Sequence, residues 1–197
     1  MDNRVQARVL GSKVLALMLG ANSIPPLGGS IGVADIRSAA EADVTRILST
    51  QQADGSYRFA VQCGYSSNFM TGLLNGVLGQ YYTHVSPDPR IQGAVQKSYD
   101  YLFASQWLPS KKLFQYYSGV CSDSNTDPGG DLNGLFLDGL GWLYSQTHAG
   151  DLLAKGDQVF EGGVLNTWLT GGKMFNQQYQ MSWRWLGYRT GMSTDAH

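Results

Sequence analysis

Charged residues are scarce in this sequence, which carries 14 Lys and Arg and 15 Asp and Glu among its 197 residues. They make up 15% of the chain and give a formal net charge of −1. A protein that binds nucleic acid shows a basic patch or stripe, so we expect no nucleic-acid partner. Long hydrophobic runs are also lacking. The longest, Val14 to Leu19, is far shorter than the ~20 residues of a transmembrane helix, and we expect no membrane span.

Histidines and cofactor-binding motifs are equally sparse. Of the three histidines, His84 and His148 fall in short turns between expected helices, and His197 is the last residue. This placement argues against a zinc site and against a Ser–His nucleophile pair. The glycines of residues 28–32 lack the preceding strand and the lysine of a phosphate-binding loop. We therefore expect neither a metal nor a cofactor.

What the sequence does contain is apolar and aromatic, with 43% hydrophobic and 12% aromatic residues. This content excludes a disordered chain and suffices for one core, so we expect a single domain over residues 1–197, either whole or a fragment of a larger protein. Stretches free of proline show helical periodicity, and all six prolines fall between them. The pattern predicts an all-α protein with seven helices, at about residues 3–19, 34–50, 66–83, 90–107, 131–147, 150–168 and 173–190.

The expected helices are of two kinds. Helix 90–107 carries its apolar residues on one stripe, as expected for a helix with one face in water. Helices 66–83 and 131–147 are apolar nearly all round, and each contains three glycines. A glycine inside a helix costs about 1 kcal/mol relative to alanine. Three glycines in one helix therefore need a packing reason, and close approach of neighbouring backbones supplies one. These two helices and 173–190 are predicted to form an inner layer.

The two glycine-rich helices match each other at an offset of 62 residues. Met70-Thr-Gly-Leu73 corresponds to Leu132-Asn-Gly-Leu135 without a gap, and the match ends at Tyr82 and Tyr144. A weaker third copy ends at Tyr188. Each repeat joins an outer and an inner helix, over approximately residues 34–83, 90–147 and 150–190. Such helical hairpins bury their apolar faces only by stacking, into a solenoid or a ring.

Two of the connections are long, at residues 51–65 and 108–130, and both precede an inner helix. Because successive helices alternate in direction, both loops are expected at the same end of the bundle. Loops of this length are usually functional or disordered. Their aromatic and glycine content favours ordered structure, and we expect short β-hairpins only in these loops.

This organisation resembles the α/α-toroid superfamily of six-hairpin glycosidases and toroid polysaccharide lyases. The resemblance is carried by the Thr/Asn-Gly-Leu openings of the inner helices, by the run Gln51 to Tyr57, and by Trp107 and Trp168 at the ends of two outer helices. It implies a glycan partner, bound by the long loops and the amino-terminal ends of the inner helices. A closed ring of six hairpins needs about twice this length, so we expect an incomplete toroid of about seven helices. An exposed apolar edge of such an arc would favour a homodimer.

The candidate site residues come from the long-loop end. We assign catalytic roles to Tyr57, Tyr116 and Asp131, and substrate-binding roles to Arg58, Asn68, Asn133, Asn176, Gln177 and Tyr179. A glycoside hydrolase would use two carboxyl groups about 5–10 Å apart, whereas a uronate lyase would use a tyrosine base beside Arg or Asn. Both reactions stay open, as does a non-catalytic scaffold or interaction domain of a larger secreted or surface protein. Helix capping is the structural alternative for Asp131, and packing between repeats for Asn133 and Gln177.

The two cysteines, Cys63 and Cys121, each lie in one of the long loops, after an aromatic segment. If the loops share one face, the pair can form a disulfide, which requires Cα atoms about 4.4–6.8 Å apart. A disulfide would indicate an extracytoplasmic protein, periplasmic or secreted. Two separately buried thiols are the alternative.

Overall fold

The computed structural model describes residues 2–20, 32–57, 66–118, 128–166 and 172–191, with the backbone alone for 172–180. Seven α-helices lie in this part of the chain: α1 (Asn3–Met18), α2 (Val33–Ser49), α3 (Asn68–His84), α4 (Pro89–Ser105), α5 (Leu137–Thr147), α6 (Gly150–Asn166) and α7 (Gly172–Thr190). Their bounds confirm the predicted helices to within two residues, apart from the start of helix 131–147. None of the described helices is long and apolar enough to span a membrane.

The first part of the predicted helix 131–147 is instead a 3₁₀ helix, η2 (Gly130–Phe136), which leads directly into α5. Its tighter winding accompanies contacts that Asn133 makes with two other segments. Asn133 Oδ1 accepts the backbone N–H of Phe114 at 3.1 Å, and Asn133 Nδ2 donates to the carbonyl of Val159 at 2.7 Å. The winding of this segment is therefore tied to tertiary contacts.

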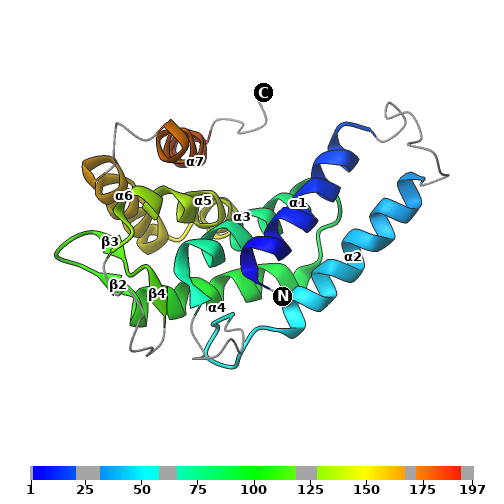
Figure 1. Ribbon diagram of the computed structural model, residues 1–197, viewed down its shortest axis with the longest axis horizontal. Helices are drawn as coiled ribbons and strands as arrows, with labels where there is room; N and C mark the ends of the chain where they lie inside the picture. Colours follow the sequence, from blue (N-terminus) through cyan, green and yellow to red (C-terminus); the bar gives the residue numbers. More distant parts are fainter. Residues whose placement is uncertain (1, 21–31, 58–65, 119–127, 167–171, 192–197) are drawn as a thin grey trace.

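The helices form two layers (Figure 1). α1, α3, α5 and α7 make up the inner layer, in which each helix contacts the next, while α2, α4 and α6 pack outside them. Along α3, Gly76 lies against Asp138 and, one turn later, Gly79 lies against Trp142. Both contacts advance together along the two helices, so α3 and α5 run in the same direction.

Close approach to a helix backbone recurs at the α3–α5 and α5–α7 contacts of the inner layer. A methyl group on Gly79 would lie 2.6 Å from Trp142 Cγ, closer than real side chains come. Between α5 and α7, Gly141 lies against the Tyr188 ring in the same manner. A larger residue does not fit at these positions, as the predicted inner layer requires, and the same holds for Gly156 and Gly162 of the outer helix α6.

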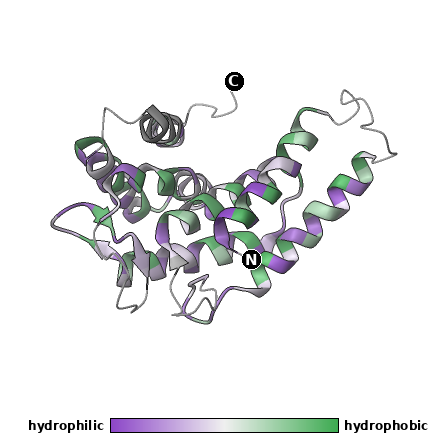
Figure 2. Cartoon of the chain, in the orientation of Figure 1, coloured by the Kyte–Doolittle hydropathy of each residue, from purple (hydrophilic) through white to green (hydrophobic). Residues whose placement is uncertain are grey.

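The outer helices bury one face only. α4 buries a stripe that includes Ile91, Val95 and Leu102, whereas every residue from 137 to 143 in α5 is buried. Figure 2 shows polar and apolar residues alternating along α2, as in a helix with one face in solvent. Asp88 caps α4 by accepting the N–H of Arg90 at 3.0 Å.

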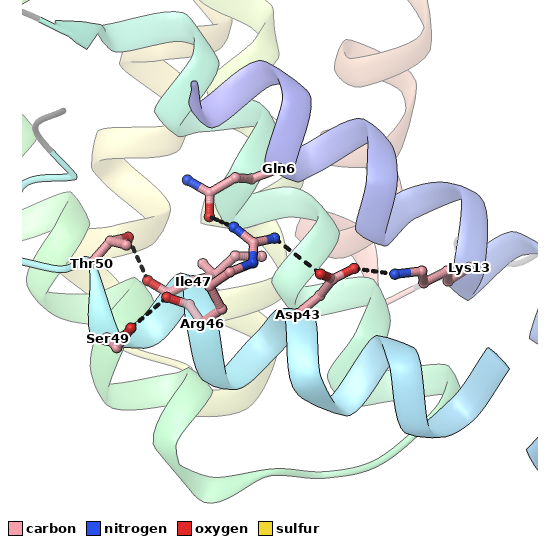
Figure 3. A network of polar contacts seen from close by, with 7 residues as sticks. All are labelled: Gln6, Lys13, Asp43, Arg46, Ile47, Ser49 and Thr50. Atoms are coloured by element: carbon pink, nitrogen blue, oxygen red, sulfur yellow. Dashed lines mark hydrogen bonds and ion pairs between the residues drawn. The ribbon is translucent and has the colours of Figure 1, made fainter. Parts of the chain in front are cut away.

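A polar network joins α1 to the outer helix α2 (Figure 3). Lys13 Nζ lies 2.5 Å from Asp43 Oδ2, and Arg46 donates to Asp43 Oδ1 at 3.0 Å. Arg46 also donates to Gln6 Oε1 at 3.1 Å. Partial burial works to raise the pKa of Asp43, but the hydrogen bonds from Lys13 and Arg46 outweigh it and hold the pKa below its ordinary value.

The two long loops meet at the same end of the bundle, as predicted. β1 (Ser66–Ser67), which ends the first loop, pairs antiparallel with β4 (Tyr117–Ser118) of the second. β2 (Trp107–Leu108) and β3 (Leu113–Phe114) form a hairpin within the second loop. In the described residues the strands thus lie in or beside these loops, although β1 pairs with the other loop and not within its own.

Candidate functional site

The loop end of the bundle brings together the first turns of α1, α3 and η2. Asn3 in α1 donates from Nδ2 to Thr71 Oγ1 of α3 at 3.0 Å and to the carbonyl of Tyr57 at 3.2 Å. The backbone N–H of Asn68 donates to the carbonyl of Tyr116 at 2.9 Å. Hydrogen bonds therefore fix both loops to the amino-terminal ends of the inner helices.

Three aromatic rings cluster at this end: Phe69 at the start of α3, Tyr116 just before β4 and Tyr117 in β4. The ring centroids of Phe69 and Tyr116 are 5.0 Å apart, and those of Tyr116 and Tyr117 are 4.5 Å apart. The guanidinium of Arg4 lies over the Phe69 ring, 5.7 Å from its centroid. We call Arg4, Phe69, Tyr116, Tyr117 and the nearby Asp131 the loop-end cluster.

The charges of Arg4 and Asp131 both affect the pKa of the Tyr116 hydroxyl. Burial raises its pKa first, and Tyr117 and Asp131 raise it further, while Arg4 acts in the opposite direction. The net shift is upward, so the hydroxyl of Tyr116 is protonated near neutral pH and can donate a hydrogen bond. Asp131, in the first turn of η2, and Tyr116 are both partly exposed.

Asn68 and Asn133, two of the predicted substrate-binding residues, are buried and hydrogen-bonded. Asn68 Nδ2 donates to Gln106 Oε1 at 3.2 Å and to the carbonyl of Gln115 at 2.9 Å. Asn133 adds a bond to the carbonyl of Lys112 at 3.2 Å to those with Phe114 and Val159. Both amides hold the second loop against the inner helices, which is the packing alternative foreseen for Asn133.

Tyr57, a predicted catalytic residue, is only 1% exposed. Burial raises the pKa of its hydroxyl, and no hydrogen-bond partner for that oxygen lies among the described residues. A lyase base must act as tyrosinate, which burial without a nearby cation disfavours. The geometry thus gives Tyr57 a place in the core beside the loop-end cluster, not in the group of partly exposed side chains.

Several predicted residues lie outside the part of the chain that the structure describes. Arg58, Cys63 and Cys121 belong to segments 58–65 and 119–127, as do the loop aspartates Asp123 and Asp127. Asn176, Gln177 and Tyr179 lie in the first half of α7, whose backbone alone is described.

The structure adds Arg4 and Phe69, to which the sequence interpretation gave no role in the site. A usable signal was their position, since each lies in the first turn of an inner helix at the end where the long loops were expected. No cluster of three or more metal-binding side chains occurs among the described residues. The loop-end cluster offers aromatic faces, one cation and one carboxylate, a combination suited to a ligand with both apolar faces and hydroxyl groups.

No protein-family profile matches the chain, and no curated protein sequence is significantly similar to it. Among solved structures, the fold is similar to that of a GH76 alpha-mannanase of Bacteroides thetaiotaomicron, with a TM-score of 0.65 and 11% sequence identity. The match covers 90% of this chain and 51% of the mannanase chain. The chain thus spans about half the length of the structure it matches. At this identity the likeness shows the fold alone, which is an incomplete α/α toroid.

Proposed function

We propose that this chain is a carbohydrate-active α/α-toroid domain that binds a poly- or oligosaccharide at the loop-end cluster. The observation that carries the proposal is the β1–β4 pairing, which brings the Phe69 ring of α3 and the Tyr116 ring just before β4 together at the amino-terminal ends of the inner helices. Sugar rings present apolar C–H faces that stack on aromatic rings, and hydroxyl groups that pair with charged side chains.

The members of the loop-end cluster other than the buried Phe69 each have a role in this proposal. Tyr116 and Tyr117 stack on a sugar ring, and the protonated hydroxyl of Tyr116 donates to a sugar oxygen. Asp131 accepts hydrogen bonds from sugar hydroxyls, and Arg4 donates to ring or hydroxyl oxygens. Asn68 and Asn133 act as positioning residues, because they fix the second loop that carries both tyrosines.

The described residues support binding more directly than cleavage. A glycoside hydrolase needs two carboxyl groups about 5–10 Å apart. Asp131 supplies one, while Asp54 accepts hydrogen bonds from the backbone and hydroxyl of Ser56 within its own turn. Asp123 and Asp127, the other aspartates of the second loop, lie outside the described residues.

The experiment is a glycan-array and polysaccharide-degradation screen of the full chain. Because the fold is similar to that of an alpha-mannanase, α-linked mannan is the first polysaccharide to test. We expect Tyr116→Ala to weaken glycan binding about 10-fold, the size expected for losing one stacking ring. Tyr82→Ala is the matched control, since Tyr82 is also half-buried but lies near the opposite end of α3.

Two outcomes separate this proposal from the alternative of a scaffold or interaction domain. Glycan binding that Tyr116→Ala weakens and Tyr82→Ala retains supports a sugar site at the loop end. If no glycan binds, or if both variants bind as the wild type does, the interaction-domain alternative replaces the proposal. Product release that Asp131→Asn abolishes would extend the proposal from binding to hydrolysis.

An extracytoplasmic location, periplasmic or secreted, is part of the same proposal, and the cysteines provide its test. β1 and β4 pair Ser66 with Ser118. Cys63 precedes β1 and Cys121 follows β4 in the sequence, and both lie outside the described residues. A disulfide between them requires Cα atoms about 4.4–6.8 Å apart.

Intact mass of the unfolded, unreduced protein after alkylation measures the state of Cys63 and Cys121. We expect no alkylated thiol without reductant and two with it. Two alkylated thiols without reductant would rule out the disulfide and, with it, the basis for an extracytoplasmic location.

A further inference from the structure

The charged residues of the chain are divided unevenly between the two helical layers. The inner helices α1, α3, α5 and α7, together with η2, contain six Lys or Arg and two acidic residues, Asp131 and Asp138. The outer helices α2, α4 and α6 contain five Lys or Arg and seven Asp or Glu. Although the whole chain has a net charge of −1, its inner layer is therefore cationic and its outer layer acidic.

Three of the inner cations have carboxylate partners. Lys13 of α1 and Arg189 of α7 form ion pairs with aspartates of the outer helices α2 and α6. Arg184 of α7 pairs with Asp138, whose side chain is 6% exposed and also accepts a hydrogen bond from Gln80 at 2.8 Å. These three cations join one helix to another, and their charges are compensated within the fold.

Arg4 and Arg8 of α1 differ from these three cations. Both residues are exposed, and they lie one helical turn apart. Neither guanidinium forms an ion pair with a carboxylate of the described residues. Asp2, the nearest acidic residue in the sequence, caps α1 by accepting the backbone N–H of Arg4 at 2.7 Å. Among the described residues, the charges of Arg4 and Arg8 are thus left uncompensated.

The side of α1 on which Arg4 lies faces α3 and the loop-end cluster. Arg4 and Gly11 are seven residues apart and lie within about 20° of each other around the helix. Gly11 packs against α3, and the guanidinium of Arg4 lies over the Phe69 ring of α3. Lys13, nine residues after Arg4, falls on the opposite side and contacts α2. Arg8 lies about 40° from Arg4, so both uncompensated cations are on the α3 side of α1.

We propose that the loop-end cluster together with Arg8 binds an anionic glycan, whose sugars carry carboxylate, sulfate or phosphate groups. This inference rests on the proposed function and names the class of polysaccharide. A guanidinium donates several N–H groups in one plane and pairs with the oxygens of a carboxylate or a phosphate in a bidentate manner. Side chains four residues apart on a helix are neighbours, so Arg4 and Arg8 can hold one anionic group between them.

The other members of the loop-end cluster fit a ligand that is charged on one side. The protonated hydroxyl of Tyr116 is a further donor to an anionic oxygen. Asp131 of η2 repels an anionic group and accepts hydrogen bonds from hydroxyl groups, which directs the charged substituent toward α1. A neutral sugar would satisfy Tyr116, Tyr117 and Asp131 but would leave Arg8 without a role.

The test compares pairs of polysaccharides that share a backbone and differ in charge. The pairs are polygalacturonate and its methyl ester, dextran sulfate and dextran, and phosphomannan and mannan, each titrated into the full chain by calorimetry. We expect the charged member of at least one pair to bind about 10-fold more tightly or better, the size expected for a charge-assisted hydrogen bond. The pair with the largest preference identifies the anionic group.

A variant of Arg8 separates a specific site from general attraction to polyanions. Arg8→Gln should weaken binding of the charged polysaccharide about 10-fold and leave binding of its neutral partner unchanged. Lys97→Gln is the matched control, because Lys97 is also exposed and forms no ion pair with a described carboxylate, but lies on the outer helix α4. We expect Lys97→Gln to change binding less than 2-fold. Circular dichroism establishes that both variants are folded.

The outcomes distinguish this inference from the proposed function. If a neutral polysaccharide binds as tightly as its charged partner in every pair, the preference for anions is wrong and the glycan site stands. If no polysaccharide binds, the proposed function fails and the inference with it. If Arg8→Gln and Lys97→Gln weaken binding of the charged member equally, the attraction is general and the assignment to Arg4 and Arg8 is overturned.

Discussion

Helices α3 and α5 lie in the middle of the inner row, and α1 and α7 lie at its ends. The two pairs of helices differ in the size of the residues on their flanks. In the middle, glycines such as Gly76 and Gly79 let two backbones approach until side chains of one helix touch the backbone of the other. At the ends, large apolar residues such as Leu15 and Trp183 remain exposed. Small residues therefore make the α3–α5 contact, whereas the exposed large apolar residues of the described chain lie on or next to α1, α6 and α7.

The largest expected effect comes from adding a methyl group at the tightly packed contact between α3 and α5. Gly79→Ala would put a methyl group 2.6 Å from Cγ of Trp142, whose ring also packs against Tyr82. Because the indole has no room to move, we expect a loss of about 3 kcal/mol in the free energy of unfolding, measured by urea denaturation.

Gly93→Ala in α4 is the matched control for the glycine experiment. It makes the same substitution in an outer helix where no atom lies within 4 Å of the added methyl group. We expect a gain of about 0.5–1 kcal/mol, because alanine is the better helix former. Equal effects of Gly79→Ala and Gly93→Ala would contradict the close contact between Gly79 and Trp142.

The next effect compares two ion pairs of α7. Arg184 donates to Asp138, whose side chain is 6% exposed and also accepts from Gln80 at 2.8 Å. Arg184→Leu leaves that carboxylate with one partner in a buried place, and we expect a loss of about 2 kcal/mol. Arg189→Leu breaks the exposed pair with Asp157, and we expect no measurable change in Tm. Similar losses in the two variants would contradict this assignment of the α5–α7 contact.

The smallest effect is a pH dependence at the α1–α2 contact. The pKa of Asp43 is lower in the folded protein than its ordinary value of 3.8. Asp43 therefore stabilises the fold above that value, and its contribution is lost as pH falls through the lower folded pKa. We expect Asp43→Asn to reduce the difference in unfolding free energy between about pH 5 and about pH 3. A variant with the wild-type pH profile would show that the network in Figure 3 has no energetic role.

The layers could be predicted from the sequence because glycines inside helices report on neighbouring backbones. Gly76 and Gly79 have no local reason to be in a helix, and their contacts with Asp138 and Trp142 supply a tertiary one. The winding of η2 could not be predicted in this way. It accompanies bonds from Asn133 to Phe114 and Val159, which lie 19 and 26 residues away along the chain.

The candidate site could be predicted in position but less well in its members. Alternation of helix directions was sufficient to bring the two long loops to one end. It gave no information on where each side chain points, so Asn68 and Asn133 were grouped with Asp131 although they are buried and bonded to the loop backbone. Arg4 could not be assigned to the site from the sequence, because its partner ring, Phe69, has the sequence signature of a core residue.

The common direction of the inner helices has an electrostatic consequence. Peptide dipoles along one helix sum to roughly +0.5 charge at its amino-terminal end. In α1, α3 and α7 these ends lie on the same side of the protein, where they add to one another. The outer helices run the opposite way and bring their negative carboxyl-terminal ends to the same side, farther from the centre. The loop end of a chain with a net charge of only −1 thus has a positive centre and a negative rim, set by the topology before any side chain is counted.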